Sequence, residues 1–214
     1  MEIGREKAIL WTKKIIICFI SIIALGVSIG INISAALGAD PISVLFDGSS
    51  NITGMELGLI TNIINITLTI IVLFVDRKYI NIGTLIYVLS LGMSIEWGTA
   101  IYDLLVPTDN FVGKLIISLI GCLLAFVALG AYVAINIGVD AWSAIALIIS
   151  KRTGKQYRTI RMLFDFVCMI LGYFLGGTVG IVTIFSAFAG GPLIQKATEI
   201  LDKMFTKVLQ SKKA

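Results

Sequence analysis

The chain has 214 residues, of which 57% are hydrophobic and only 14% are charged. Soluble domains carry about 25% charged residues, so this chain lacks the polar surface that a water-soluble fold of its size needs. The composition therefore excludes an ordinary soluble domain and indicates an integral membrane protein. The net charge is +4, but the basic residues lie at the ends and between apolar runs. No basic patch of the kind that binds nucleic acid is present, so nucleic acid is excluded as a partner.

The residue types that carry most acid–base and metal chemistry are absent or isolated. The chain contains no histidine, and its three cysteines, Cys18, Cys122 and Cys168, lie singly inside apolar runs. Buried single cysteines usually behave as small hydrophobic residues, and histidine-based catalysis is excluded by composition. We therefore predict no disulfide, no metal site, no cofactor and no enzymatic activity.

Six apolar runs approach or exceed the roughly 20 residues that a transmembrane helix needs. In chain order they are Ile15–Leu37, Met55–Val75, Tyr79–Leu105, Val112–Ile137, Thr159–Leu175 and Val179–Ile194. The first run is too long for the apolar part of a signal peptide, so we interpret it as a retained helix. The last two are short and are joined by a tight turn at 176–178. Two more apolar segments, Pro41–Phe46 and Ala141–Ile149, are too short to span a membrane.

Lysine and arginine fall mainly on one side of this six-span arrangement, as in cytoplasmic loops. That side holds the N-terminus, the turn at 76–78, the 138–158 segment and the C-terminal tail. The other side holds Lys114 and a group of acidic residues, Asp40, Asp47, Asp103 and Asp109. We therefore predict a plasma-membrane protein with both termini in the cytoplasm. The tail 196–214 is expected to be an amphipathic helix on the membrane surface or a helical continuation of the last span into water.

The chain matches itself when it is shifted by 100 residues. The coincident pairs are Gly38 and Gly138, Asp40 and Asp140, Ser43 and Ser143, Ser50 and Ser150, and Thr53-Gly54 and Thr153-Gly154. Each half contains three spans, and because three is odd, the second half must be inverted in the membrane relative to the first. Such inverted repeats are typical of secondary transporters. We therefore predict an all-α bundle made of a first membrane repeat at 1–110, a second at 111–195 and the tail at 196–214.

Three short motifs resemble a known family. They are L-G-A-D-P at Leu37–Pro41, the dipeptide Gly83-Thr84, and G-V-D-A-W-S at Gly138–Ser143. Together they resemble the YczE/YyaS/YitT-type family of bacterial multipass membrane proteins, over nearly the whole chain. The resemblance implies a location and an architecture, and it implies no particular mechanism.

Two aspartates begin short apolar segments at equivalent positions. Asp40 and Asp140 are each followed three residues later by a serine, Ser43 or Ser143. One interpretation is that both aspartates are N-caps of short interfacial helices. The other is that the segments are re-entrant half-helices whose N-terminal ends face a cavity. The positive helix end would suit an anion, whereas the carboxylates would equally suit a cation or a proton.

Other polar residues lie inside the predicted spans. Asp165 is the seventh residue of its span, and an intramembrane carboxylate is a functional hypothesis by default. Arg161, four residues earlier, is the alternative explanation, because an i,i+4 pair would neutralise it locally. Asn65 has the same offset in the first half, with Asn62 one turn earlier. Glu96 is expected either to line a cavity or to be solvated at the membrane interface.

These observations favour a small-solute transporter or permease with its site between the two halves. The candidate substrate-binding residues are Asp40, Ser43, Asn62, Asn65, Glu96, Asp140, Ser143 and Asp165. The alternative is a membrane-embedded regulatory or interaction subunit without a transport path. The expected partners are the lipid bilayer and a small solute or coupling ion. A homo-oligomer stays open, because Gly26 and Gly30 form a G-x-x-x-G face that promotes close helix contact.

Overall fold

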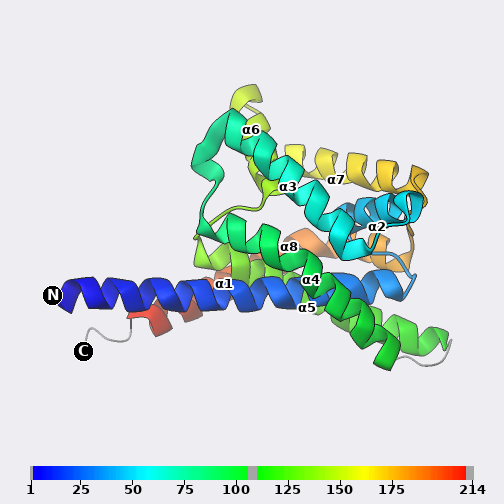
Figure 1. Cartoon of the computed structure of the whole chain (residues 1–214), viewed down its shortest axis with the longest axis horizontal. Helices are drawn as coiled ribbons and strands as arrows, with labels where there is room; N and C mark the ends of the chain where they lie inside the picture. Colours follow the sequence, from blue (N-terminus) through cyan, green and yellow to red (C-terminus); the bar gives the residue numbers. More distant parts are fainter. Residues whose placement is uncertain (1, 106–109, 211–214) are drawn as a thin grey trace.

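The structure, a computed structural model, describes residues 2–105 and 110–210, and every regular element within them is helical (Figure 1). The helices are α1 Glu2–Ser34, α2 Pro41–Thr53, α3 Leu57–Asp76, η1 Arg77–Tyr79 (a short 3-10 helix), α4 Ile82–Leu105, α5 Phe111–Ile135, α6 Ala141–Thr153, α7 Tyr157–Phe174 and α8 Ile181–Gln210. The expected all-α fold is thereby confirmed. Asp109 and the last four residues of the predicted tail lie outside the described residues.

The helices form two layers (Figure 1). In one layer α1 packs against α4 and α5, and α5 packs against α8. In the other layer α2 packs on α7, α6 contacts α3 and α7, and α2 contacts α3. The two layers meet chiefly where α3 packs against α4. Each half of the chain thus contributes its first and last helices to one layer and its two middle helices to the other.

Four helical segments of the described chain are long and apolar enough to cross a membrane. They are Ala8–Ser34, Leu57–Tyr79, Ile82–Leu105 and Phe111–Ile135. The membrane class is therefore confirmed, and four of the six expected spans coincide with helices that could cross a membrane. The other two expected spans fall on α7 and α8. Because α7 carries Arg158, Arg161 and Asp165, and α8 runs on into a polar tail, the six-span count stays a prediction.

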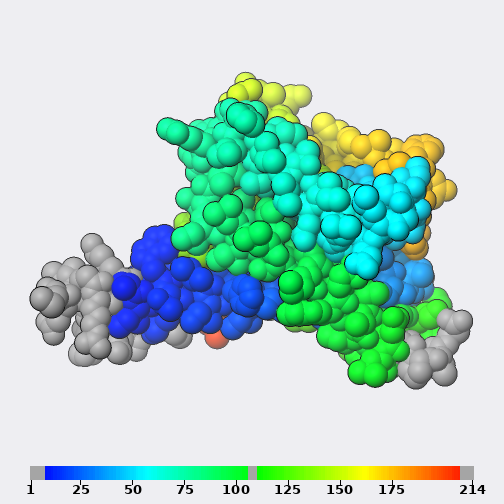
Figure 2. All heavy atoms as spheres, viewed as in Figure 1, coloured from blue at the N-terminus to red at the C-terminus, as the bar shows by residue number. Residues whose placement is uncertain are grey.

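The outward faces of the helices are strongly apolar. Figure 2 shows α3 and α4 uncovered on the near side of the molecule, and their outward side chains include Phe74, Leu89 and Leu104, which are 72–85% exposed. Soluble monomers rarely expose apolar surface on this scale. Lipid tails cover such a surface at no cost, so these faces are the ones expected to contact the bilayer.

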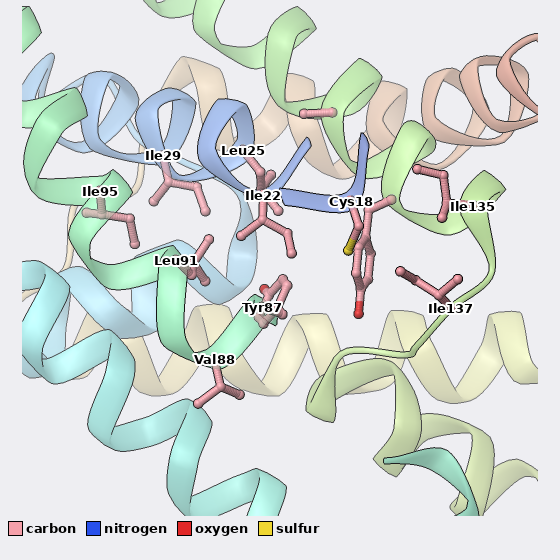
Figure 3. Packing of buried hydrophobic residues seen from close by; sticks show 12 residues of the cluster. Cys18, Ile22, Leu25, Ile29, Tyr87, Val88, Leu91, Ile95, Ile135 and Ile137 are labelled. Carbon is pink, nitrogen blue, oxygen red and sulfur yellow. The ribbon is translucent and has the colours of Figure 1, made fainter. Parts of the chain in front are cut away.

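The core of the first layer lies between α1, α4 and α5. Ile22 and Leu25 of α1 pack against Leu91 and Ile95 of α4 (Figure 3). The backbones of α1 and α4 are in contact here. A Cβ added at Gly30 would therefore overlap the carbonyl oxygen of Ile95. The close contact expected for the G-x-x-x-G face is therefore found inside one chain, between α1 and α4.

The C-terminal tail is not separated from the last predicted span. α8 is a single helix from Ile181 to Gln210, with Pro192 inside it. A proline in a helix removes one backbone hydrogen bond, yet the helix continues past it for 18 more residues. The tail up to Gln210 is thus a continuation of α8.

Candidate functional site

The two aspartates of the repeated motif cap two helices of equal length. At α2 the Asp40 carboxylate accepts hydrogen bonds from the Ser43 hydroxyl (2.5 Å) and the Ser43 backbone N–H (3.3 Å). At α6 the Asp140 carboxylate accepts one from the Ser143 backbone N–H (2.9 Å). The backbone of both aspartates is extended, with φ −62° at Asp40 and −65° at Asp140. Both aspartates are therefore N-caps, and whether the two helices are interfacial or re-entrant stays a prediction.

The two capped helices also end in the same way. Each is 13 residues long and is followed by a left-handed glycine, Gly54 (φ 67°) or Gly154 (φ 68°). The hydroxyl of Ser50, four residues before Gly54, donates a hydrogen bond to the Met55 carbonyl (2.6 Å). The hydroxyl of Ser150, four residues before Gly154, donates one to the Lys155 carbonyl (2.7 Å). The 100-residue shift therefore relates two helices with the same start, length and end.

The segment before each capped helix is hydrogen-bonded to the other half of the chain. The carbonyl of Leu37, before α2, accepts a hydrogen bond from the Val182 N–H at the start of α8 (3.1 Å). The carbonyl of Ile137, before α6, accepts one from the Gly83 N–H at the start of α4 (3.1 Å). The two connections are reciprocal: each half fixes the unwound segment of the other.

The short helices also reach the turns of the opposite half. The Asp47 carboxylate on α2 is nearly buried and accepts the Thr178 N–H of the α7–α8 connection (2.7 Å). On α6, the Lys151 ammonium lies 5.3 Å from the Tyr79 ring centroid, and Lys78 approaches the same ring (5.1 Å). Asp47, expected among the acids on the side opposite the basic loops, thus accepts a hydrogen bond within the protein. The Lys151 contact places the end of α6 beside the basic α3–α4 turn.

A chain of charged and polar side chains joins α6 to α7. The Arg161 guanidinium donates from Nη1 to the Ser143 hydroxyl (3.1 Å) and from Nε to Asp165 Oδ2 (3.3 Å). The predicted i,i+4 pair of Arg161 and Asp165 is thus present in the structure. The guanidinium also interacts electrostatically with Asp140, and Asp165 feels the charge of Asp40. Arg161 is thus bonded directly to Asp165 and, through Ser143, is linked to the α6 cap of Asp140.

A second polar link crosses between the halves beside this group. The Trp142 indole N–H donates to the Asn65 side-chain oxygen (2.9 Å), and the Asn65 amide donates to the Thr61 carbonyl (2.9 Å). Asn65 is 1% exposed and Trp142 is 3% exposed. Trp142 is also held edge-on between Phe46 of α2 and Phe164 of α7, at centroid distances of 5.8 and 5.7 Å. Asn65 is therefore engaged by the protein itself.

The two remaining candidates bind α3 to α4. The Asn62 side-chain oxygen accepts the Gly92 N–H (3.1 Å), and the half-buried Glu96 carboxylate accepts the Gly58 N–H at the start of α3. A carboxylate at a helix N-terminus is stabilising. Neither expectation for Glu96, a cavity lining or a solvated interface, anticipated this bond.

Some groups at this site carried no signal in the sequence. The bond from Arg161 to Ser143 and the bond from Trp142 to Asn65 join residues 18 and 77 positions apart. The hydroxyl of Tyr132 on α5 is buried without a hydrogen-bond partner. Under the 100-residue shift, the matches of Asn65 with Asp165, of Asp40 with Asp140 and of Ser43 with Ser143 pointed to this region from both halves.

Two apolar hollows lie on the sides of α3. One, of about 210 Å³, is lined by residues of α3 and α6, and the other, of about 260 Å³, by residues of α3 and α4. Neither hollow is lined by a candidate substrate-binding residue. Their apolar linings are suited to lipid chains and not to a polar solute.

The apolar helices, their exposed hydrophobic faces and the buried polar group define a helical integral membrane protein. Residues 12–199 match the family of unknown function DUF6198, and the chain belongs to that family. It is 23% identical to the uncharacterized membrane protein YczE of Bacillus subtilis (81% of this chain, 79% of that one). It is 24% identical to the uncharacterized protein YyaS of the same organism (87% and 92%).

A third relative extends the comparison beyond Bacillus. The chain is 24% identical to an uncharacterized protein of Haemophilus influenzae, over 91% of this chain and 89% of that one. No solved structure matches the chain. The resemblance drawn from the three motifs is thereby confirmed for the YczE and YyaS type of protein.

Proposed function

We propose that this protein is a small-solute transporter or permease of the bacterial plasma membrane, with its site between two inverted halves. The observation that carries the proposal is the polar group in which Arg161 bonds Asp165 and, through Ser143, the α6 cap of Asp140. The matching cap of the first half is Asp40 on α2, whose charge acts on Asp165. Ionisable residues inside a membrane protein are costly and mark solute or ion pathways in transporters.

The contacts between the halves support the inverted arrangement. The reciprocal bonds of Leu37 with Val182 and of Ile137 with Gly83 are those expected when two similar units face each other about a two-fold axis. Transporters built in this way place their site at the repeat interface, near discontinuous helices. In this chain the discontinuities are the unwound segments before α2 and α6. On this proposal the two short helices are re-entrant, and their capped ends face the site.

The positions of the chain ends support six spans with both termini on one side. α1 begins and α8 ends on the same side of the molecule, and the α3–α4 turn lies toward that side too (Figure 1). Lys78 of η1 and Lys151, in the last turn of α6, both lie over the Tyr79 ring. The positive-inside rule makes this side cytoplasmic. The proposal includes no enzymatic step.

Solute uptake into proteoliposomes tests the function. The purified protein would be reconstituted and offered a mixture of isotopically labelled amino acids, sugars and organic acids under an imposed proton or sodium gradient. We expect at least one solute to accumulate above protein-free vesicles, with uptake reduced at least tenfold by Asp165→Asn. Asp103→Asn, on an exposed part of α4, is the matched control and should retain full uptake. Uptake equal to that of protein-free vesicles would remove the proposal.

The second candidate is a membrane-embedded regulatory or interaction subunit. The observation in its favour is that candidate residues are engaged by the protein: Asn65 by Trp142, Asn62 by Gly92, and Glu96 by Gly58. Cross-linking in native membranes would identify a stoichiometric partner of such a subunit. A single recurrent partner together with no solute uptake would favour this candidate over the transporter.

A further inference from the structure

We propose that the hollow between α3 and α6 binds one anionic phospholipid, with an acyl chain in the hollow and the lipid phosphate on Arg152. The hollow has a volume of about 210 Å³ and is formed where α6 lies against the second half of α3 (Figure 1). Lipid binding of this kind requires only that the chain lies in a bilayer. It therefore goes beyond the proposed function and does not rest on it.

The floor of the hollow is apolar and closely packed. Val72 of α3 and Ile148 of α6 are buried there, in one hydrophobic cluster that also contains Tyr79. The walls are open, because the α3 side chains Ile71 and Val75 are exposed. Atoms that line an unfilled hollow lack dispersion contacts on one side. A hydrocarbon chain that lies in the hollow restores these contacts.

One end of the hollow carries a positive charge. Among the described residues that line it, Arg152 is the one charged side chain, and it lies in the last turn of α6. On α6 the lining runs from Ile145 to Arg152, which lie about 10 Å apart along the helix axis at about 1.5 Å per residue. The hollow thus has an apolar length and a charged end, as a phospholipid has.

The protein does not neutralise the charge at this end. In the part of the chain that the structure describes, the exposed Arg152 side chain forms no hydrogen bond or ion pair. Lys151 lies over the Tyr79 ring (5.3 Å), and this contact leaves its charge in place. Lys78 lies over the same ring and is paired with Asp76. Three cations beside one carboxylate leave two positive charges for a ligand.

The second hollow of α3 provides a contrast within the same molecule. It has a volume of about 260 Å³ and lies between α3 and α4. Its described lining residues are apolar apart from Thr69, and none of them is charged. Any lipid chain fits such a surface, whatever its headgroup. The hollow at Arg152 is therefore the one of the two that can distinguish headgroups by their charge.

The chemistry at Arg152 selects an anionic phospholipid. A guanidinium binds phosphate oxygens through two parallel N–H donors, and basic pockets between transmembrane helices bind anionic headgroups. A zwitterionic lipid would bring its own cation toward Lys151, which repels it. Free phosphate lacks the chain that fills the hollow. A phospholipid with a net negative charge therefore satisfies both the apolar length and the charged end.

Thermal unfolding of the purified full-length protein in detergent tests the site. Phosphatidylglycerol, phosphatidylcholine with the same acyl chains, and inorganic phosphate would be titrated separately at constant ionic strength. A ligand that binds only the folded state stabilises it, so phosphatidylglycerol should raise the melting temperature to a plateau. Phosphatidylcholine and phosphate should leave it unchanged at the same concentrations. No effect of phosphatidylglycerol, equal effects of the two lipids, or stabilisation by phosphate alone would each overturn the proposal.

A first pair of variants tests the headgroup contact. Arg152→Gln should raise the phosphatidylglycerol concentration at half-maximal stabilisation about tenfold, which corresponds to about 1.4 kcal/mol. Lys203→Gln is the matched control, because it removes the same charge from an exposed position of α8, which packs on α5 in the other layer. It should keep the wild-type dependence on lipid. An unchanged dependence in Arg152→Gln, or an equal loss in both variants, would overturn the site.

A second pair tests the acyl chain. Ile71→Trp fills the hollow and should also weaken stabilisation by phosphatidylglycerol. Ile63→Trp is the matched control, since Ile63 is similarly exposed on α3 and lines neither hollow. Equal effects of the two tryptophans would contradict an acyl chain in the hollow.

The test does not depend on a variant of uncertain folding. Arg152 is exposed and unpaired in the described chain, so Arg152→Gln should melt at the wild-type temperature when no lipid is added. The first pair of variants therefore decides the matter even if Ile71→Trp does not fold. Lipid-specific stabilisation without solute uptake, or uptake without it, separates this inference from the proposed function.

Discussion

The indole N–H of Trp142 donates a hydrogen bond to the side-chain oxygen of Asn65, 2.9 Å away, with both residues almost completely buried. Trp142 belongs to the second half of the chain and Asn65 to the first. Ile42, which the 100-residue shift places opposite Trp142, belongs to the same hydrophobic cluster. Equivalent positions of the two halves thus pack together at the centre of the second layer.

Loss of this bond should destabilise the protein. Trp142→Phe keeps an aromatic ring but leaves the Asn65 oxygen buried without a donor, at a cost of about 1–3 kcal/mol. We expect a lower melting temperature by circular dichroism in detergent. The double variant Asn65→Leu with Trp142→Phe removes both polar partners and should recover part of the loss. If the double variant loses as much stability as Trp142→Phe and Asn65→Leu lose in sum, the hydrogen bond contributes nothing to the stability of the protein.

Close packing of α1 on α4 gives a second prediction. Gly30→Ala would place a methyl group against the Ile95 carbonyl and the Thr99 backbone nitrogen, neither of which can move without shifting α4. Overpacking of this kind costs about 1–3 kcal/mol, so the melting temperature should fall. Gly191→Ala is the matched control, because nothing lies within 4 Å of its added Cβ. It should be neutral or stabilising by up to about 1 kcal/mol. Equal effects of the two substitutions would contradict the packing.

The parts of the site that the sequence predicted are local in the chain. The caps follow from an aspartate and a serine three residues apart at Asp40 and Asp140, and the ion pair follows from the i,i+4 spacing of Arg161 and Asp165. Such pairs depend on helix geometry alone. The partner of Asn65, by contrast, is 77 residues away and depends on how α3 and α6 pack.

The predicted ends of the helices show a different limit. A change from apolar to polar residues marks where a chain leaves the membrane, and a helix can continue beyond that point. α1 begins at Glu2, well before the apolar run that starts at Ile15, and α8 continues to Gln210, past the expected end at Ile194. Hydropathy therefore predicted where the apolar runs lie and did not predict where the helices begin and end.

Removal of the partly buried Arg161 guanidinium should cost more stability than removal of its partner Asp165. Arg161→Met removes the positive partner of Asp165, and breaking a fully buried pair from one side costs about 3–5 kcal/mol. The two side chains are 24% and 30% exposed, so the loss should lie below that range. Asp165→Asn leaves Arg161 with Ser143 and Asp140, so its effect on the melting temperature should be smaller. The double variant Arg161→Met with Asp165→Leu should be more stable than Arg161→Met alone. A larger loss for Asp165→Asn than for Arg161→Met would contradict this assignment.

The inverted arrangement predicts which loops a reagent can reach from outside the cell. The α6–α7 connection contains Lys155, and its neighbour Lys151 lies over Tyr79 beside the basic α3–α4 turn. Asp103 is exposed near the other end of α4. In intact cells a membrane-impermeant maleimide should label Asp103→Cys and should label Lys155→Cys only after permeabilisation.

The background of this labelling experiment is low, because the three native cysteines are free but buried. The unsubstituted chain is therefore a suitable control and should stay unlabelled before and after permeabilisation. If Lys155→Cys reacts in intact cells as readily as Asp103→Cys does, the two halves are not inverted. The carboxylates of Asp40 and Asp140 would then have no reason to converge from opposite faces of the membrane, and a site shared between the halves would lose its basis.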